Sequence, residues 1–289
     1  MKKKVTYFFE GEVPFDTIET KIGFRVKKGL YSGKSSYQKI HIFDLYFYGK
    51  TLFLDRVLQT AEKDEFIYHE MLCQAPLFVH SSPRRVLIVG GGDGGSLEEV
   101  LKHISVQEAW MVEIDKKVVD ISRKYLPSIS KNAFQDKRAH LIYGDGKEFI
   151  TKREDFFDVV ILDLSDPGGP ARNLISQKFY DSVKRSLHKN GIVSIQLGSL
   201  TTQPGLITLI KRRLQKVFRF VQIRGAVVPS YQAGLYSFMM ASDFNFLKVS
   251  QSVLEKKFKN AKKMNLKYWS PEIHEASAVL PLYLKQELK

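Results

Sequence analysis

Acidic side chains follow several short apolar runs in the chain, at positions where they could bind a cation or accept a proton. Asp93, Glu113, Asp145, Asp163 and Asp166 all stand in such places. If these runs are parallel strands, their carboxyl ends meet at the sheet edge where open α/β folds bind ligands. The acids would then share one crevice in a chain whose net charge is +14. An acidic crevice in a basic protein predicts a positively charged ligand.

A glycine-rich segment supplies the backbone for such a site. Gly90, Gly92 and Gly95 fit the pattern G-x-G-x-x-G between the apolar run 86–89 and a helical pattern that begins at Ser96. Glycine permits positive φ angles and lets a ligand approach the backbone closely. Glu113 comes about 20 residues later, where an acid can bind ribose hydroxyls. This context predicts a nucleoside-binding turn.

Asp93 distinguishes between kinds of nucleoside. A carboxylate in this turn would repel the pyrophosphate of a dinucleotide, so Asp93 favours a nucleoside that carries positive charge. The alternative is that Asp93 faces away and caps the following helix.

Two carboxylates lie three residues apart in the loop after another predicted strand. Asp163 and Asp166 can face the same site, since Pro167 and Pro170 stiffen the loop. One carboxylate could accept a proton while the other binds an ammonium group. The alternative is an Asx turn that closes the strand.

These residues need a sheet to position them, and the sequence from Arg84 onward predicts one. Helical patterns separate the first five predicted strands and recur around 203–216, whereas only 229–234 separates the last two, which we expect to pair as a hairpin. The predicted strands are 86–90, 109–114, 139–143, 157–163, 191–197, 219–227 and 235–241. The pattern predicts an α/β fold: a seven-stranded, methyltransferase-like (Rossmann-like), doubly wound sheet with one antiparallel strand. A basic amphipathic helix is expected over 249–263.

Residues 1–62 read as a separate antiparallel β lobe, followed by a catalytic domain over 63–289. Segments 20–28, 39–47 and 50–54 alternate in polarity, with a hairpin turn expected near Gly49. A helix from about 62 to 78 follows. It carries five polar residues close together: Asp64, Glu65, Tyr68, His69 and Glu70. They could contribute side chains to the site, or they could form a polar helix face around a core tyrosine.

Composition limits the remaining classes. With 44% hydrophobic and 26% charged residues the chain is an ordinary globular one, and it has no apolar run long enough to span a bilayer. Its single cysteine, Cys73, excludes an internal disulfide and suits a reducing compartment, so we expect a cytoplasmic protein. The lysines are scattered and no metal-ligand spacing occurs, so we expect neither a metal nor specific nucleic-acid binding.

Several motifs together resemble the polyamine aminopropyltransferase family, of which spermidine synthase is the best-known member. The resemblance covers essentially the whole chain. It rests on Gly33–Gln38, Asp64–Met71, Gly90–Gly95, Val112–Asp115, Gly144–Gly146, Asp163–Ala171 and the tail from Tyr268 to Pro281. It implies transfer of an aminopropyl group from decarboxylated S-adenosylmethionine, as co-substrate and without further cofactor, to a polyamine, with release of 5′-methylthioadenosine. It also implies a homodimer or homotetramer.

The resemblance assigns roles residue by residue. Asp163 would be the proton acceptor. The donor, or methylthioadenosine, would be bound by Gln38, Gly90, Gly92, Asp93, Glu113, Asp145, Gly146 and Pro170. The acceptor amine would be bound by Tyr68, His69, Asp93, Asp166, Gln196 and Tyr231.

The acceptor side departs from the commonest family pattern. Leu164 replaces the usual serine, and the segment Gln196–Ser199 lacks the usual acid. These features lean toward thermospermine synthase-like members, so putrescine, agmatine and longer amines such as spermidine all stay open as acceptors. Two other functions also stay open: a methyltransferase acting on a basic small molecule, and a noncatalytic polyamine- or nucleoside-binding protein.

Overall fold

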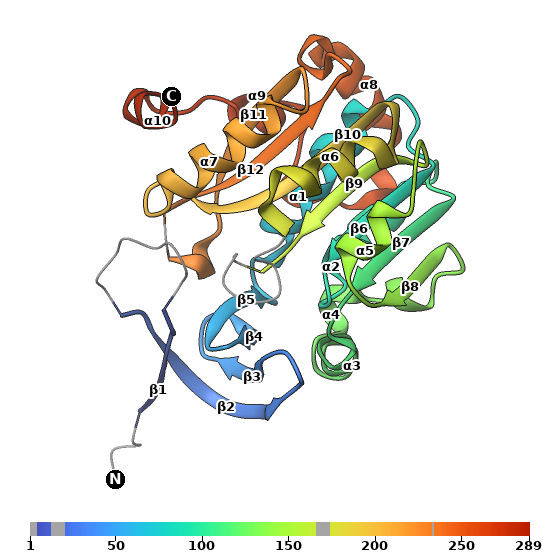
Figure 1. Ribbon diagram of the computed structural model, residues 1–289. Coiled ribbons are helices and arrows are strands. Elements are labelled where there is room, and N and C mark those ends of the chain that lie inside the picture. Colours follow the sequence, from blue (N-terminus) through green and yellow to red (C-terminus); the bar gives the residue numbers. More distant parts are fainter. Residues whose placement is uncertain (1–4, 13–20, 166–173, 233) are drawn as a thin grey trace.

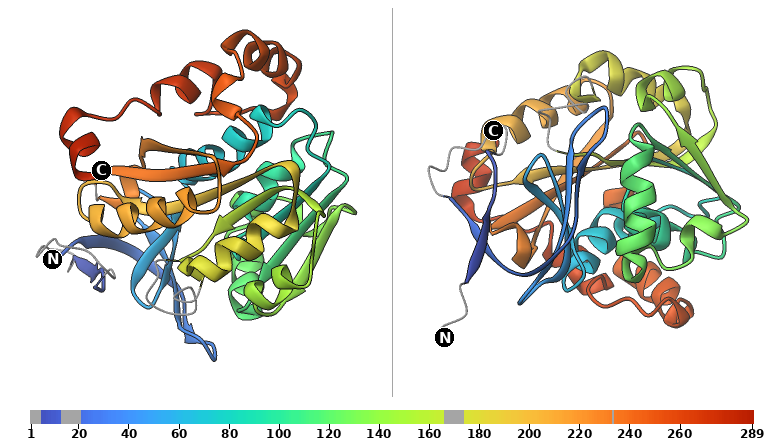
Figure 2. Two further views of the ribbon diagram at one scale, coloured as in Figure 1. Left: turned by 45° about the horizontal axis from the view of Figure 1, so that its top comes forward. Right: turned by 90° about the horizontal axis from the view of Figure 1, so that it is seen from below.

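The computed structural model describes residues 5–12, 21–165, 174–232 and 234–289, which form two β-sheets with helices around the second (Figures 1 and 2). The first sheet is the predicted N-terminal lobe. Its strands follow one another in chain order, each antiparallel to the last: β1 (Thr6–Phe9), β2 (Gly23–Lys34), β3 (Lys39–Leu45), β4 (Gly49–Leu54) and β5 (Val57–Ala61). The predicted turn is present, with Gly49 at φ 71°.

The second sheet has the order β11-β12-β10-β9-β6-β7-β8. Neighbours are parallel from β10 through β8, whereas β12 lies antiparallel between β10 and β11. The strands are β6 (Arg85–Gly90), β7 (Glu108–Glu113), β8 (Ala139–Tyr143), β9 (Phe157–Asp163), β10 (Leu187–Ser199), β11 (Phe220–Val227) and β12 (Leu235–Ser242). The predicted fold class, with a terminal hairpin and one antiparallel strand, is confirmed.

Two hydrophobic cores cover the two faces of this sheet, because successive side chains of a strand point to opposite sides. In β6, Val86 and Ile88 enter one core, and Leu87 and Val89 enter the other. The first core contains α1 (Glu65–Val79), α2 (Gly95–Leu101) and α8 (Gln251–Asn260). The second contains α5 (Gly146–Thr151), α6 (Gln177–Ser186), α7 (Pro204–Gln215) and α10 (Leu282–Glu287).

A third core joins the N-terminal lobe to two helices that follow β7. Ile40, Ile42 and Leu52 of the N-terminal lobe pack against Val118 of α3 (Lys116–Tyr125) and Ile129 of α4 (Pro127–Ser130). This packing holds the N-terminal lobe beside the edge of the second sheet where β6 and β7 end.

Short elements complete the described chain. They are α9 (Pro271–Ala276) and the 3₁₀ turns η1 (Ala133–Gln135), η3 (Pro229–Tyr231), η4 (Phe246–Lys248) and η5 (Lys262–Met264). The helix predicted over 249–263 therefore ends sooner than expected, at Asn260, and continues as a separate 3₁₀ turn. None of the helices in the described ranges has the length and apolar character needed to cross a membrane.

Candidate active site

A cavity of about 1300 Å³ opens between the N-terminal lobe and the carboxyl ends of the second sheet's strands. Four of the predicted acids reach it: Asp93, Glu113, Asp145 and Asp163. Other predicted residues on its wall are Gln38, Tyr68, Gly90, Gly92, Gly146, Gln196 and Tyr231. Asp166 and Pro170 lie outside the described residues.

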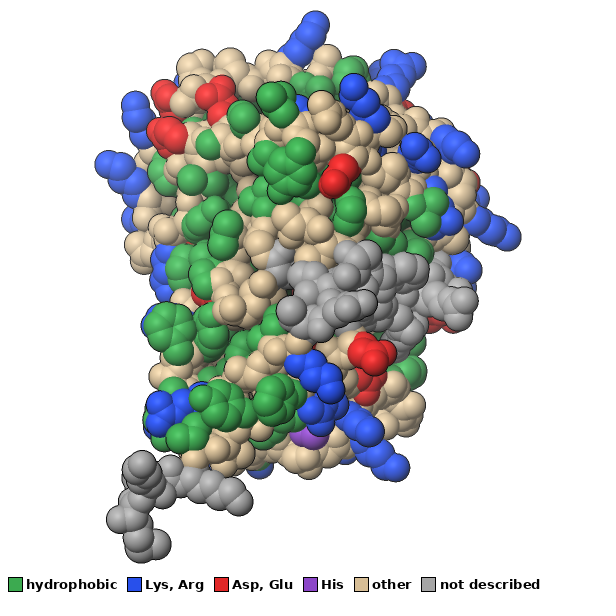
Figure 3. All heavy atoms as spheres, turned by 90° about the vertical axis from the view of Figure 1, so that its left-hand side faces the viewer, with side chains coloured by type: hydrophobic (Ala, Val, Ile, Leu, Met, Phe, Trp, Pro, Cys, Tyr) green, Lys and Arg blue, Asp and Glu red, His purple; other side chains and the backbone are tan. Residues whose placement is uncertain are grey.

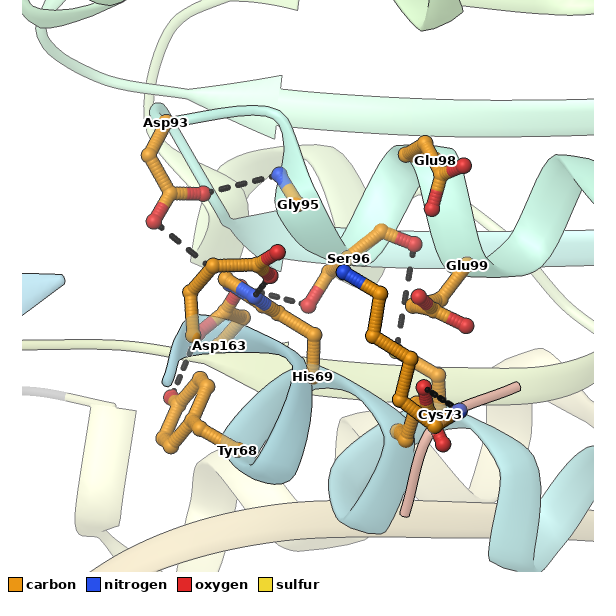
Figure 4. Close-up of polar contacts among 12 residues, drawn as sticks. Tyr68, His69, Cys73, Asp93, Gly95, Ser96, Glu98, Glu99 and Asp163 are labelled. Carbon is orange, nitrogen blue, oxygen red and sulfur yellow. Dashed lines mark hydrogen bonds and ion pairs between the residues drawn. The ribbon is translucent and has the colours of Figure 1, made fainter. Parts of the chain in front are cut away.

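Asp163 ends β9 and has both carboxylate oxygens hydrogen-bonded. Tyr68 Oη donates to Oδ1 at 2.6 Å, and Ser96 Oγ donates to Oδ2 at 2.6 Å (Figure 4). Burial raises the pKa of Asp163, and the nearby Asp93 carboxylate raises it further. A carboxylate with a raised pKa and fixed orientation is suited to accept a proton.

The glycine turn packs directly against this strand end. Gly90 has φ 86°, and a Cβ there would lie 2.1 Å from the carbonyl oxygen of Asp163, so glycine is required. The Gly91 N–H donates to the same carbonyl at 3.0 Å. The turn and the acid therefore hold each other in place.

Asp93 both accepts a hydrogen bond at the start of α2 and faces the cavity, which were the two alternatives left open by the sequence. Its Oδ1 accepts from the N–H of Gly95 at 2.9 Å, within the first turn of α2, while Oδ2 lies 3.5 Å from His69 Nε2. Burial alone would raise the pKa of Asp93, but the His69 ring lowers it to below its usual value. The carboxylate also lines the cavity.

Glu113 ends β7 and is almost fully buried at the cavity wall. Its Oε1 accepts from the N–H of Asp115 at 2.9 Å. Burial raises the pKa of Glu113 to about 7. A ligand that donates hydrogen bonds to this carboxylate would favour the ionised form.

The loop between β2 and β3 reaches the site through Asp115. Asp115 Oδ2 accepts from Ser35 Oγ at 2.6 Å and from Gln38 Nε2 at 3.0 Å. Its Oδ1 accepts from the N–H of Lys117, so the same side chain caps α3. Gln38 is thus positioned across the junction of the two sheets.

Asp145 and Gly146 begin α5 beside Glu113. Asp145 Oδ1 accepts from the N–H of Lys147 at 2.7 Å and serves as the helix N-cap. The side chain is exposed to the cavity, and Gly146 is buried because Val89 fills the space that a Cβ would need.

The part of the cavity wall around Gln196 is aromatic. Gln196 of β10 donates through Nε2 to the Leu164 carbonyl and accepts through Oε1 from Tyr236 Oη. Tyr231 Oη donates to the Gln59 carbonyl at 2.8 Å, and its ring contacts Tyr68 edge-on at 5.8 Å. Both hydrogen-bonding ends of Gln196 are therefore engaged.

Three of the predicted residues form a group with metal-like spacing. One ligand atom from each of His69, Asp93 and Asp163 lies within 4.8 Å of the others. These side chains already have protein partners. Tyr68 and Ser96 donate hydrogen bonds to Asp163, and His69 contacts Asp93. We interpret the group as a polar network.

His69 occupies a different place from the other predicted residues. Its ring is 1% exposed and lies behind Asp93 instead of on the cavity wall.

Two further contacts were not predicted from the sequence: the hydrogen bond from Ser96 to Asp163 and the one from Gln38 to Asp115. Neither bond could be inferred, because the first joins residues 67 positions apart in the chain and the second joins residues 77 positions apart.

Comparison with known proteins decides the family. The model of the spermine/spermidine synthase domain matches residues 65–251, and that of the spermidine synthase tetramerisation domain matches residues 15–62. The chain belongs to the spermine/spermidine synthase family. Its members are aminopropyltransferases, so the predicted family and enzyme class are confirmed.

Relatives of this family match along most of their length. A polyamine aminopropyltransferase of Thermoanaerobacter sp. (strain X514) is 40% identical over 92% of this chain and 93% of the relative. One from Erwinia tasmaniensis is 39% identical over 96% of this chain and 98% of its own.

Solved structures agree with this assignment. A spermidine synthase bound to the transition-state analogue AdoDATO has a TM-score of 0.90 and 35% identity over 98% of this chain and 94% of that one. The spermidine synthase of Thermotoga maritima has a TM-score of 0.90 and 34% identity, covering 100% and 96% of the two chains.

Proposed function

We propose that the cavity transfers the aminopropyl group of decarboxylated S-adenosylmethionine to a polyamine and releases 5′-methylthioadenosine. One observation carries the proposal: partly buried, hydrogen-bonded Asp163 lies near Asp93 on the wall of a cavity that the glycine turn, Glu113 and several aromatic residues also line.

The donor is proposed to lie along Gln38, Gly90, Gly92, Glu113, Asp145 and Gly146. Glu113 accepts hydrogen bonds from the ribose, and Asp145 with Gly146 frames the base. Asp93 binds the ammonium group of the aminopropyl chain. The same carboxylate repels the extra carboxylate of intact S-adenosylmethionine, which gives the site its selectivity.

The acceptor is proposed to lie against Tyr68, Gln196 and Tyr231, with one nitrogen at Asp163. A primary amine is protonated at neutral pH, with a pKa near 10, so it must lose a proton before it attacks. Asp163 takes that proton. The nitrogen then forms a bond to the carbon next to the sulfonium, the C–S bond breaks, and its electron pair stays on sulfur. Because the sulfonium is a good leaving group, the protein mainly aligns the reacting atoms, and no metal is needed in this scheme.

Polar groups continue along the acceptor side beyond Asp163. Gln59, Gln203 and Tyr236 line the cavity, as do Glu10 and Glu12. Successive polar groups suit a linear amine with more than one nitrogen. We propose a polyamine acceptor, with putrescine, agmatine and spermidine as the candidates to be separated by experiment.

A competition assay tests the function directly. Decarboxylated S-adenosylmethionine is supplied with putrescine, agmatine, cadaverine, spermidine and spermine together, and products are read by mass spectrometry. One amine should gain an aminopropyl group as methylthioadenosine appears. A methylated product from intact S-adenosylmethionine would indicate a methyltransferase, and binding without any product would indicate a binding protein.

The Asp163→Asn variant tests the catalytic base. Turnover should fall by about 10²–10⁴, the usual contribution of a positioned base, while methylthioadenosine still binds. A matched control is Asp158→Asn, which changes the same residue type on the same strand away from the cavity. Near-normal turnover in Asp163→Asn would remove this residue from the role.

We propose that the chain assembles through its N-terminal lobe. The matched tetramerisation domain supports assembly, and this lobe exposes the large hydrophobic side chains Val5, Tyr7, Phe9, Tyr46 and Phe47. Figure 3 shows hydrophobic side chains exposed on one face of the molecule. Sedimentation analysis of the purified chain distinguishes the two expected forms, a homodimer and a homotetramer.

We also propose a cytoplasmic location. The support is the lone Cys73, which is a free, buried thiol and suits a reducing compartment. Fractionation of cells that produce the chain tests this assignment.

A further inference from the structure

His69 lies between two carboxylates that come from different elements. Its Nδ1 is 2.8 Å from Glu65 Oε2, one turn earlier on α1, and its Nε2 is 3.5 Å from Asp93 Oδ2 in the glycine turn. A neutral imidazole has one N–H and one lone pair, so it can donate to only one of the two acids. When both carboxylates are ionised, only the doubly protonated ring satisfies both contacts.

The ring is fixed in this place by the glycine turn. A Cβ on Gly95 would lie 2.2 Å from His69 Cε1, so the ring lies against the backbone of the turn (Figure 4). The ring is also 1% exposed, and other residues form the cavity wall. His69 therefore contacts Asp93 and does not line the cavity into which substrates would bind.

The charged groups that contact the ring are carboxylates, and the titratable Tyr68 packs edge-on against it at 5.1 Å between ring centroids. Glu65 faces it from α1, Asp93 from the glycine turn, and Asp163 lies in the same group at the end of β9. Burial alone would lower the pKa of His69, but the contacts with Asp93 and Glu65 raise it well above its usual value. A cation in this place offsets the repulsion between Asp93 and Asp163, which would otherwise favour protonation of one of them.

We propose that His69 is a positioning residue that stays protonated and holds the Asp93 carboxylate ionised beside Asp163, so that the site keeps two negative charges for substrate ammonium groups. This inference rests on the proposed function. It assigns His69 to the donor side through Asp93, and it differs from the direct contact with the acceptor amine that the family resemblance implied.

The protonation of His69 is measurable without turnover. Long-range ¹H–¹⁵N correlation spectra of the ¹⁵N-histidine-labelled full chain should show one imidazolium at pH 8 that is missing from His69→Gln. Glu65→Gln, which keeps the ring, should lower the pH at which that signal changes. A neutral His69 ring at pH 7 would overturn the inference, whatever the enzyme proves to catalyse.

The consequence for catalysis is a pH-dependent defect. In His69→Gln, kcat/KM for decarboxylated S-adenosylmethionine should fall about tenfold more at pH 6.5 than at pH 8.5, because Asp93 then protonates more easily. The control is His103→Gln, a buried histidine bonded to Gln74 outside the cavity, which should leave the shape of the pH profile unchanged.

Other outcomes count against the inference. A loss that is equal at every pH would mean that His69 only supports the fold. A rise confined to KM for the acceptor amine would mean that it contacts the acceptor. Absence of turnover in the wild-type chain would contradict the proposed function but leave the spectroscopic result to stand alone.

Discussion

Three acids of one crevice differ in what surrounds them, and this sets what each can do. Asp163 receives two hydroxyl donors, Asp93 faces an imidazole ring, and Glu113 accepts from the backbone N–H of Asp115 just beyond its own strand. Burial raises the pKa of Asp163 and of Glu113, whereas contact with His69 lowers the pKa of Asp93 despite burial. These surroundings support the proposed roles of Asp163 as the base, Glu113 as the hydrogen-bond acceptor for ribose and Asp93 as an ionised carboxylate.

The pKa of about 7 at Glu113 gives a prediction for ligand binding. Ribose hydroxyls donate better to the carboxylate than to the protonated acid, so binding favours loss of the proton. The dissociation constant of methylthioadenosine should therefore rise about tenfold as the pH falls from 8 to 6. Titration calorimetry at several pH values measures it.

The Glu113→Gln variant is the matched control for that titration. It cannot ionise, so its weaker binding should change little over the same range. Wild-type affinity that does not vary with pH would contradict the assignment of Glu113 to the ribose.

At the scale of elements, α1 distributes buried polar contacts in several directions. Asp64, just before the helix, accepts from the Ser230 N–H and so holds the loop of Tyr231, while Tyr68 reaches Asp163 and Glu70 reaches the tail. One of the two arrangements expected from the sequence, a polar helix face around a core tyrosine, therefore describes only part of the helix. Its polar residues are mostly buried, and Tyr68, His69, Glu70 and Gln74 each make a hydrogen bond.

Glu70 gives a test of that arrangement. Its carboxylate accepts from the backbone N–H groups of Lys267, Tyr268 and Trp269 at 2.8–2.9 Å. Glu70→Gln places an amide donor against those donors, and the variant should lose roughly 2–4 kcal/mol of unfolding free energy. Urea denaturation measures the loss.

The exposed Glu275 of α9 provides the comparison, because Glu275→Gln removes the same charge from a surface position. It should change stability by less than about 0.5 kcal/mol. Equal effects of the two substitutions would show that the buried contacts of Glu70 contribute nothing particular.

The outline of this fold could be predicted because its strands are short apolar runs separated by helical patterns. The predicted strand 157–163 coincides with β9, and the hairpin of β11 and β12 follows from the short segment between them. The acids at strand ends were also foreseeable, since topology brings those ends together. The contacts of His69, Ser96 and Asp115 were not, because they depend on side-chain packing between elements that are distant in the sequence.

At the scale of the whole molecule, buried histidines link stability to pH. Burial, helped by the nearby Arg224 guanidinium, lowers the pKa of His274 to about 3. In the unfolded chain its pKa is near 6.5, so between these values the unfolded state binds more protons and is favoured. The contribution of His274 to stability is complete above pH 6.5 and falls by roughly 2 kcal/mol between pH 7 and pH 5.

The comparison of wild type with His274→Gln isolates this effect from the other titrating groups. As the pH is lowered from 7 to 5, the unfolding free energy of the wild type should fall by more than that of the variant. Parallel pH dependences for the two proteins would show that His274 does not titrate differently in the folded chain.

The place of β12 in the sheet has a consequence for how the chain is completed during its synthesis. β11 joins the sheet through β12, which follows it in the sequence and lies between it and β10. A ribosome must therefore add residues up to Ser242 before either strand can dock, whereas β6, β7 and β9 are available by Asp163. The side of the crevice that carries the glycine turn, Glu113 and Asp163 can form while the chain is still growing, and the wall containing Tyr236 completes it only near the end of translation.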